Sequence, residues 1–416
     1  MAQQDQKGES VNRALSRRQF MTQTGAAALS LTILRPELVR GTQTNSKIKL
    51  GVIGLGGRGA WIAGLFQKHG GYELVAGADY FRDRVDAFGA KFSIPSPRLF
   101  VGLSGYKRLL EAGVDAVAIE TPPYFHPEQA AAGVDAGVHV YLAKPAAVDV
   151  PGCHVISECG KKATARKRAF FIDFQTRTNP LFIEALKRVH QGDIGELVFG
   201  EAIYHADCPF EQWYDLLTKD PGNPEVWMRG WGLDRALSGD MITEQDIHAL
   251  DVMNWIMQEP PLYAIGSGGL TARPKIGTCW DHFAVYYQYP KKVAFQFSGR
   301  QFNGYGTPEG IKNRMFGSKG VLETEYGGNV LIRGENFFRG GKTAEIYEEG
   351  VVNNIVTFYK NMTEGDFANP TAVPSVQSNL ITILGRKSAY ENRLVTWDEL
   401  VKDKEKLIPN LKGLKD

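Results

Sequence analysis

The sequence has few cysteines and almost no excess of either charge. Four cysteines among 416 residues are too few for a disulfide scaffold, and their positions lack the paired spacing of metal ligands. With 48 basic and 46 acidic side chains the net charge is +2, which gives no electrostatic case for nucleic acid or a membrane surface as partner. No apolar run reaches the ~20 residues that a membrane-spanning helix needs. Disordered, collagen-like, repeat-array and polytopic membrane classes are therefore excluded, and a globular chain with a sizeable core remains.

Residues 1–46 differ in character from the rest of the chain. Ser16-Arg17-Arg18-Gln19-Phe20 is a twin-arginine pattern, and the weakly apolar stretch 22–34 follows it. Together they resemble a bacterial Tat export signal, which predicts a periplasmic or exported protein. The alternative is a basic tail that happens to contain two arginines. Because the Tat route carries folded proteins, a nucleotide loaded before export would have to stay bound afterwards.

A glycine-rich turn follows the first predicted strand. Residues 48–53 read as a buried strand, Gly54-Leu55-Gly56-Gly57-Arg58-Gly59 comes next, and residues 60–66 read as a helix. In such a unit the glycines permit a tight turn, close approach of a pyrophosphate and close helix packing. A second strand-like run ends at Asp79, where an acid binds ribose hydroxyls. Asp79 favours NAD, while the arginines at 58, 82 and 84 leave NADP open.

Strands and helices continue to alternate through the first half of the chain. Strand-like runs at 115–120 and 138–142 flank a helix-like stretch that starts at His126. This alternation predicts an α/β fold with a doubly wound parallel sheet, whose ligands bind beyond the carboxyl ends of the strands. The candidate cofactor contacts at these ends and in the turn are Gly54, Gly56, Gly57, Arg58, Gly59, Asp79, Thr121, Pro122, His126 and Lys144.

The ordered motifs resemble those of the Gfo/Idh/MocA oxidoreductase family. The matching segments are the glycine turn 54–59, Thr121-Pro122-Pro123-Tyr124-Phe125-His126, the run 136–145 that ends in Lys144-Pro145, Gly192-Asp193-Ile194-Gly195, Ile247-His248 and Thr396-Trp397. The resemblance implies an N-terminal Rossmann domain, followed by an α/β domain with an open, mostly antiparallel sheet that commonly forms homo-oligomers. We assign residues 47–172 to the first domain, 173–372 to the second, and 373–416 to a C-terminal helix and tail that pack back towards the Rossmann domain.

The resemblance also implies the catalytic residues. Lys144 matches the lysine that faces the substrate, but Ala143 stands where the family usually has glutamate, so the orientation and pKa of Lys144 are open questions. Glu244 and His248 match the family's acid and histidine, with Glu244 one methylene longer than the usual aspartate. We expect Glu244, His248 and Asp251 to share one helical face. His248 would act as base and Lys144 would stabilise the alkoxide.

Substrate contacts are expected where the chain enters the second domain. If residues 174–180 are extended, Gln175, Arg177 and Asn179 lie on one side, and Arg177 and Gln175 become candidate sugar ligands. Trp231 is a candidate stacking partner within the irregular stretch 208–237, which we interpret as a substrate-capping insertion. Asp251 is a further candidate. No metal site is expected, because the acidic helix lacks a second histidine.

These features predict an exported oxidoreductase that transfers hydride between tightly retained NAD(P) and a secondary hydroxyl of a sugar or glycoside. A redox-neutral glycosidase, working by transient oxidation, elimination and re-reduction, remains an alternative. A non-catalytic nucleotide-binding protein is a third hypothesis.

Overall fold

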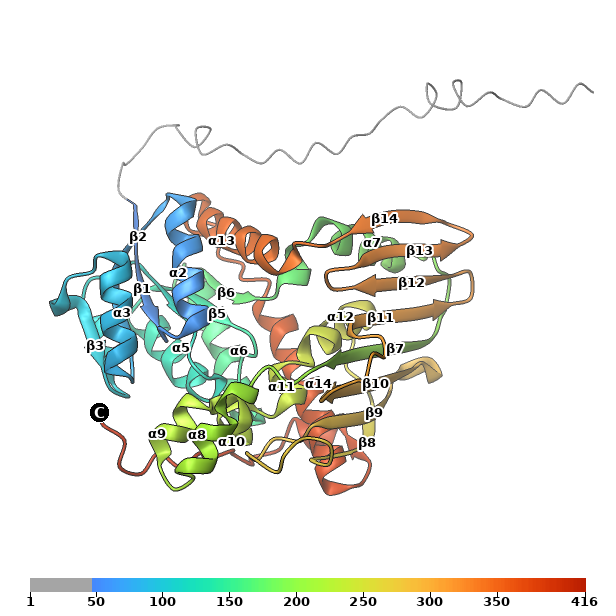
Figure 1. Cartoon of the computed structure of the whole chain (residues 1–416). Helices are drawn as coiled ribbons and strands as arrows, with labels where there is room; N and C mark the ends of the chain where they lie inside the picture. Colours follow the sequence, from blue (N-terminus) through green and yellow to red (C-terminus); the bar gives the residue numbers. More distant parts are fainter. Residues whose placement is uncertain (1–46) are drawn as a thin grey trace, which may run out of the picture. The chain divides into compact units, whose positions relative to one another are not determined.

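The computed structural model describes residues 47–416, so the twin-arginine segment lies outside the described residues. Two sheets occupy the described chain, with helices packed around the first and on one face of the second (Figure 1). Within residues 47–416 no helix has the length and apolar character needed to cross a membrane.

The first sheet is parallel throughout and runs in the order β3-β2-β1-β4-β5-β6. Its strands are β1 (Ile48–Ile53), β2 (Tyr72–Asp79), β3 (Leu99–Val101), β4 (Ala116–Ile119), β5 (His139–Ala143) and β6 (Phe170–Asp173). The helices between them are α2 (Gly57–His69), α3 (Arg82–Phe92), α4 (Gly105–Leu110), α5 (His126–Asp135) and α6 (Val150–Ala165). The predicted doubly wound sheet is confirmed. Because strand order reverses between β1 and β4, their carboxyl ends form the crevice where such folds bind ligands.

The second sheet is mostly antiparallel, as predicted, with one parallel pair, β7 and β10. Its strands are β7 (Leu197–Ala206), β8 (Tyr263–Gly269), β9 (His282–Gln288), β10 (Ala294–Gln301), β11 (Gly310–Gly317), β12 (Gly320–Glu325), β13 (Asn329–Gly334), β14 (Phe338–Lys342) and β15 (Val395–Thr396). Along β9, the buried side chains Phe283, Val285 and Tyr287 alternate with more exposed ones. This period of two turns one face towards the helices and leaves the other face open.

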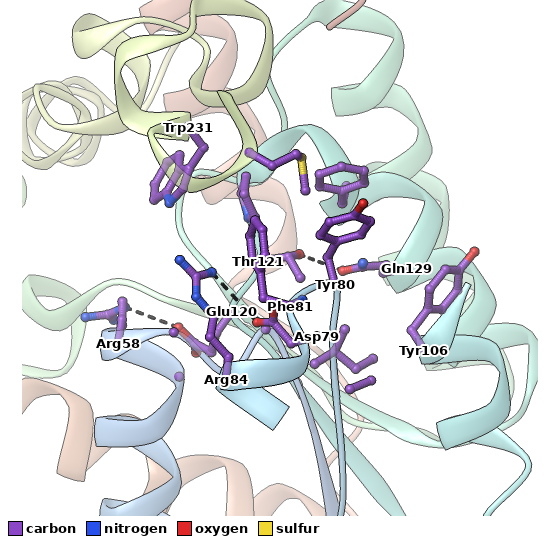
Figure 2. A pocket seen from close by; sticks show the side chains of 18 of the residues that line it. Arg58, Asp79, Tyr80, Phe81, Arg84, Tyr106, Glu120, Thr121, Gln129 and Trp231 are labelled. Carbon is purple, nitrogen blue, oxygen red and sulfur yellow. Dashed lines mark hydrogen bonds and ion pairs between the residues drawn. The ribbon is translucent and has the colours of Figure 1, made fainter. Parts of the chain in front are cut away.

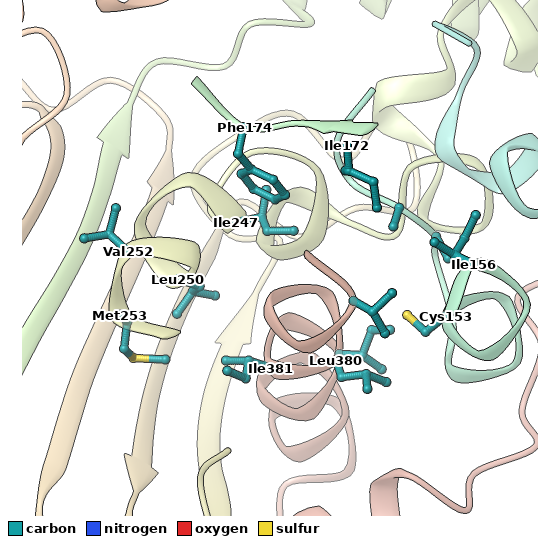
Figure 3. Close-up of a cluster of buried hydrophobic side chains, with 14 of the residues drawn as sticks. Cys153, Ile156, Ile172, Phe174, Ile247, Leu250, Val252, Met253, Leu380 and Ile381 are labelled. Carbon is teal, nitrogen blue, oxygen red and sulfur yellow. The ribbon is translucent and has the colours of Figure 1, made fainter. Parts of the chain in front are cut away.

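Helices join the two sheets through a shared apolar core (Figure 3). The remaining long helices are α7 (Pro180–His190), α12 (Ile247–Met257), α13 (Ile346–Glu364) and α14 (Ala372–Glu391), with the short α11 (Met241–Glu244) and α15 (Trp397–Leu400). Leu250 of α12, Ile381 of α14 and Ile156 of α6 are fully or almost fully buried in this core. Burying each such side chain contributes about 1.5–3 kcal/mol, so the core holds α12 firmly against α14 and against strands β7 and β11 of the second sheet.

The predicted insertion is an ordered lobe of short helices rather than a loop. It comprises the 3-10 helix η5 (Glu211–Trp213), α8 (Tyr214–Lys219), α9 (Pro224–Arg229), the 3-10 helix η6 (Trp231–Leu233) and α10 (Arg235–Ser238). Asn223 caps α9 by accepting a hydrogen bond from the Glu225 N–H, and Pro224 occupies its first position. The lobe has its own small core around Phe210, Leu217 and Leu233.

Candidate functional site

The glycine turn has a backbone that other residues could not adopt. Gly54 has φ +88°, and a Cβ on it would lie 2.6 Å from the Glu120 carbonyl carbon. A Cβ on Gly59 would lie 1.9 Å from the Gly54 oxygen, so α2 packs closely on the turn. Gly56 precedes α2, whose first turn has neither a side-chain cap nor an acidic residue. The N–H groups at this end are therefore available to a pyrophosphate.

A cavity of about 280 Å³ lies along the turn (Figure 2). Its wall includes Gly56, Gly57, Thr121 and Pro122. Asp79 also lines it, with a carboxylate oriented by the Leu55 N–H at 2.7 Å and the Phe81 N–H at 2.9 Å. A turn open to phosphate and a fixed acid at the end of β2 fit a dinucleotide bound across the crevice.

Two of the predicted cofactor contacts have other partners. His126 is fully buried, with Nδ1 2.8 Å from the Pro145 oxygen and Nε2 2.8 Å from the Thr121 oxygen. Burial lowers its pKa to about 4. His126 thus connects the loops that follow β4 and β5 through its two ring nitrogens, and it does not line the cavity. Arg58 does line it, but its Nη2 lies 2.6 Å from Asp173 Oδ2 and its Nε 3.2 Å from Glu120 Oε2, so its guanidinium is committed to carboxylates rather than to phosphate.

Lys144 forms an ion pair with Glu244, from the second half of the chain. Its Nζ lies 3.1 Å from Glu244 Oε1 and also donates to the Glu244 carbonyl oxygen. Lys144 is therefore oriented without a carboxylate at position 143, because Glu244, 100 residues later in the chain, holds its amine. Burial raises the pKa of Glu244, and the charge of Lys144 opposes that rise.

His248 lies in the same electrostatic neighbourhood. Its ring packs 5.5 Å from that of Tyr326, and its Nδ1 is buried without a hydrogen-bond partner. Burial, followed by the charges of Lys144 and Arg58, lowers the pKa of His248 well below its usual value. The imidazole is therefore neutral near pH 7, in the form that accepts a proton.

The expectation that Glu244, His248 and Asp251 share one face of a single helix is wrong. α11 ends at Glu244 and α12 begins at Ile247, so a turn separates the acid from His248. Lys144 and Glu244 meet because this turn presents both the carbonyl and the carboxylate of Glu244 to the end of β5.

A polar cluster that the motifs missed extends this site. Glu120 follows the apolar strand β4, Asp173 is the last residue of β6, and both carboxylates contact Arg58. Burial raises the pKa of Glu120 to about 8, although Arg58 opposes the rise. A carboxylate at the end of an apolar strand was the available sequence signal for both acids. Tyr326, which follows β12, had no comparable signal.

Several buried polar atoms of this region lack partners within the described chain. They are Glu120 Oε1, Tyr141 OH, Gln175 Oε1, Glu244 Oε2, His248 Nδ1 and Tyr326 OH. Buried polar groups are rarely left unpaired, so a cluster of them indicates a place for a polar ligand or water.

Arg177 and Asp251 are paired with each other instead of facing the site. Arg177 Nη2 lies 2.8 Å from Asp251 Oδ1, its Nε donates to the same carboxylate, and Ser378 Oγ donates to Asp251 at 2.6 Å. The expected extended segment is a 3-10 helix, Gln175–Thr178. Contrary to expectation, Gln175, Arg177 and Asn179 therefore do not lie on one side of an extended segment. Arg177 and Asp251 have a structural role, and Gln175 is buried with an unpaired side-chain oxygen.

The insertion lobe reaches the cavity. Trp231, Trp213 and Met228 line this dinucleotide cavity. The sugar-stacking role expected of Trp231 stays a prediction. Arg84 Nη1 lies 3.9 Å from Asp79 Oδ2 in the same wall. Within residues 47–416, no three His, Cys, Asp or Glu side chains gather in a way that could hold a metal ion.

Comparison with known proteins supports this geometry. Residues 48–170 match the profile of the Gfo/Idh/MocA oxidoreductase family with an NAD-binding Rossmann fold, and residues 182–323 match the family's C-terminal domain. A myo-inositol 2-dehydrogenase of Thermotoga maritima is 24% identical over 85% of this chain and 100% of its own length. A glycosyl hydrolase family 109 protein of Shewanella is 30% identical over 44% of this chain and 38% of its own.

A solved structure shares the fold. The WlbA dehydrogenase of Bordetella pertussis, in complex with NADH and UDP-GlcNAcA, has a TM-score of 0.65 and 20% identity over 84% of this chain and 99% of its own.

Proposed function

Because the chain belongs to the Gfo/Idh/MocA family of NAD-dependent oxidoreductases, we propose that its substrate is a secondary hydroxyl of a sugar or glycoside. The observation that carries this proposal is the ion pair of Lys144 with Glu244, whose ammonium lies close enough to the neutral His248 to lower its pKa. NAD, when bound, supplies the hydride acceptor.

The residues divide the work by charge. His248 takes the hydroxyl proton, for which its neutral imidazole is suited, and such base assistance is typically worth ~10²–10⁴ in rate. Lys144 donates a hydrogen bond to the oxygen as it becomes an alkoxide, and its position against Glu244 holds that donor in place beforehand. For the reverse reaction the same groups return the proton to a carbonyl oxygen.

The partnerless atoms favour a ligand with many hydroxyls. Glu244 Oε2 and Gln175 Oε1 are acceptors, and the Tyr326 hydroxyl can accept or donate. A polyol or pyranose carries several hydroxyls on one ring, so a single molecule can donate to more than one such acceptor. This chemistry supports a sugar over a simple alcohol.

A single-turnover experiment tests the proposal. The purified protein is loaded with NAD and mixed with a panel of inositols, aldoses and glycosides, and the near-ultraviolet absorbance of reduced nicotinamide is followed. At least one sugar should reduce the bound cofactor, and Lys144→Ala and His248→Ala should slow that reduction by about 10²-fold or more. If both variants reduce the cofactor as fast as the parent protein, the proposed site is wrong.

The second candidate is a redox-neutral glycosidase, favoured by the segment similar to the Shewanella protein. Oxidation of a ring hydroxyl makes the neighbouring C–H acidic, a base removes that proton, and the glycosidic C–O bond breaks as the aglycone leaves with a proton. Water then adds, and hydride returns to the carbonyl. Release of aglycone from an aryl glycoside without net NADH would favour this cycle, whereas NADH in proportion to product would favour the dehydrogenase.

Export and self-association complete the proposal. We propose that residues 16–34 direct Tat export, tested by replacing Arg17 and Arg18 with lysine and locating the protein in cell fractions.

We also propose a homo-oligomer through the open face of the second sheet, where Val198, Phe199 and Ile265 are exposed. Light scattering on the purified protein gives its mass directly.

A further inference from the structure

The cavity at the Asp79 end is covered by a part of the chain that the Rossmann motif does not include. Trp213, Met228 and Trp231 of the insertion lobe line the same cavity as the glycine turn, and Figure 2 shows Trp231 above Asp79 and Arg84. In the Rossmann arrangement, the acid after β2 holds the ribose of the adenosine. The lobe therefore covers the adenosine half of the dinucleotide site.

The lobe is fastened to the first sheet just after Asp79. Arg229 of α9 makes two hydrogen bonds to the Asp83 carboxylate, the shorter 2.8 Å long, and its guanidinium lies 3.9 Å from the centre of the Phe81 ring. Phe81 and Met228 belong to one apolar cluster that also includes Trp231 at its edge. Charge pairing and apolar contact thus act together on the same short segment.

The C-terminal tail closes the arrangement from the other side. The Tyr80 hydroxyl donates to Glu225 Oε1 of the lobe at 2.6 Å and accepts from the Lys415 N–H at 3.3 Å. The Leu103 N–H donates to the Lys415 oxygen at 3.1 Å, and Leu414 packs at the edge of the apolar cluster. One hydroxyl therefore links the lobe, the tail and the end of β2. In Figure 1 the chain ends beside α9 and β3.

We propose that the insertion lobe is a lid over the adenosine half of NAD and that the C-terminal tail latches it, so that NAD leaves only when the latch opens. The lid residues that contact the adenosine are Trp213, Met228 and Trp231. The Glu225–Tyr80–Lys415 link is the latch that the tail provides, and the Arg229–Asp83 pair attaches the lid directly to the first domain. This assignment makes the tail and the lobe part of the cofactor site. It matches the need of an exported enzyme to keep a cofactor that it cannot replace outside the cell.

Nucleotide exchange tests the lid without any sugar. Protein purified from cells is passed through gel filtration, denatured and assayed for released NAD, and a second sample is mixed with excess isotope-labelled NAD to time the exchange. The parent protein should keep most of its NAD and exchange it slowly. Arg229→Gln should exchange about two- to five-fold faster, since exposed ion pairs are weak. Tyr80→Phe should exchange roughly ten-fold faster, because it loses two hydrogen bonds.

Arg333→Gln is the matched control, because Arg333 forms a comparable exposed pair with Glu323 in the second sheet. It should exchange at the parent rate. Tyr80 also lines the cavity, whereas Arg229 does not. Arg229→Gln therefore tests the attachment of the lid without altering the cavity wall, and it decides whether the lobe is a lid if Tyr80→Phe fails to fold. The proposal is overturned if the parent protein loses its NAD on gel filtration, or if Arg229→Gln exchanges no faster than Arg333→Gln. Neither outcome depends on which hydroxyl is oxidised. The proposed hydride transfer is therefore tested independently, by the single-turnover experiment with added NAD.

Discussion

Two buried ion pairs connect the end of the first sheet to the α11–α12 segment, and they differ in how completely they are satisfied. In the Arg177–Asp251 pair, the carboxylate receives two guanidinium nitrogens and the Ser378 hydroxyl. In the Lys144–Glu244 pair, Lys144 makes one contact with the carboxylate, and Glu244 Oε2 has no partner. The satisfied pair joins elements of the fold, whereas the unsatisfied one keeps a carboxylate oxygen that can still accept a hydrogen bond. Hydrogen-bond saturation, rather than residue type, separates the two roles.

The largest expected effect comes from removing the amine of the unsatisfied pair. Lys144→Met should slow single-turnover hydride transfer roughly 10³-fold, because a preorganised donor to the developing oxyanion is lost. NAD content after gel filtration should stay at the parent level, since the glycine turn and Asp79 are untouched. A loss of less than ten-fold would mean that Lys144 is only a structural partner of Glu244.

Breaking the satisfied pair should instead affect stability. Asp251→Asn should lower the free energy of unfolding by about 3–5 kcal/mol, because it leaves the Arg177 charge without its counter-ion. The rate of hydride transfer per folded molecule should not change. Urea denaturation measures the first quantity and single-turnover absorbance the second. A stable Asp251→Asn protein with slow hydride transfer would return Asp251 to the substrate site.

Neutralising the free acceptor should weaken the sugar without releasing the cofactor. Glu244→Gln keeps the backbone carbonyl that Lys144 contacts but removes a charged acceptor, so the dissociation constant of the sugar should rise about 10- to 100-fold. Glu323→Gln, on the exposed part of the second sheet, is the control and should bind sugar normally. Unchanged sugar affinity in Glu244→Gln would place the substrate elsewhere.

The smallest effect concerns pH. Burial makes the imidazolium form of His248 costly, so its pKa in the folded protein lies below the ordinary 6.5 and the neutral base persists as the pH falls. The acid limb of the single-turnover rate should therefore have its midpoint below pH 6.5, and His248→Asn should lack that limb. A midpoint at or above 6.5 would show that another group is the base.

The strand-to-glycine-turn unit was predictable because it is local. β1, the turn, α2 and Asp79 lie within 32 consecutive residues, and Gly54 and Gly59 are required by backbone geometry that their neighbours impose. The spacing alone therefore indicates a dinucleotide site. Prediction was wrong where it assumed regular geometry across a break, as for Gln175–Asn179 and for Glu244 with His248.

The sequence by itself determined the order of the parts: a glycine turn, an acid at the end of β2, a lysine after β5 and a histidine in the first turn of α12. Only the tertiary structure decided which of the charged side chains are left unsaturated. Lys144 pairs with Glu244, although Ala143 stands beside it where the family usually has glutamate. Arg58 forms ion pairs with Glu120 and Asp173, and Arg177 forms one with Asp251. The physical reason is that a buried charge takes the nearest opposite charge in space, and spatial proximity between residues 58 and 173, or 144 and 244, arises only when the sheets and helices pack.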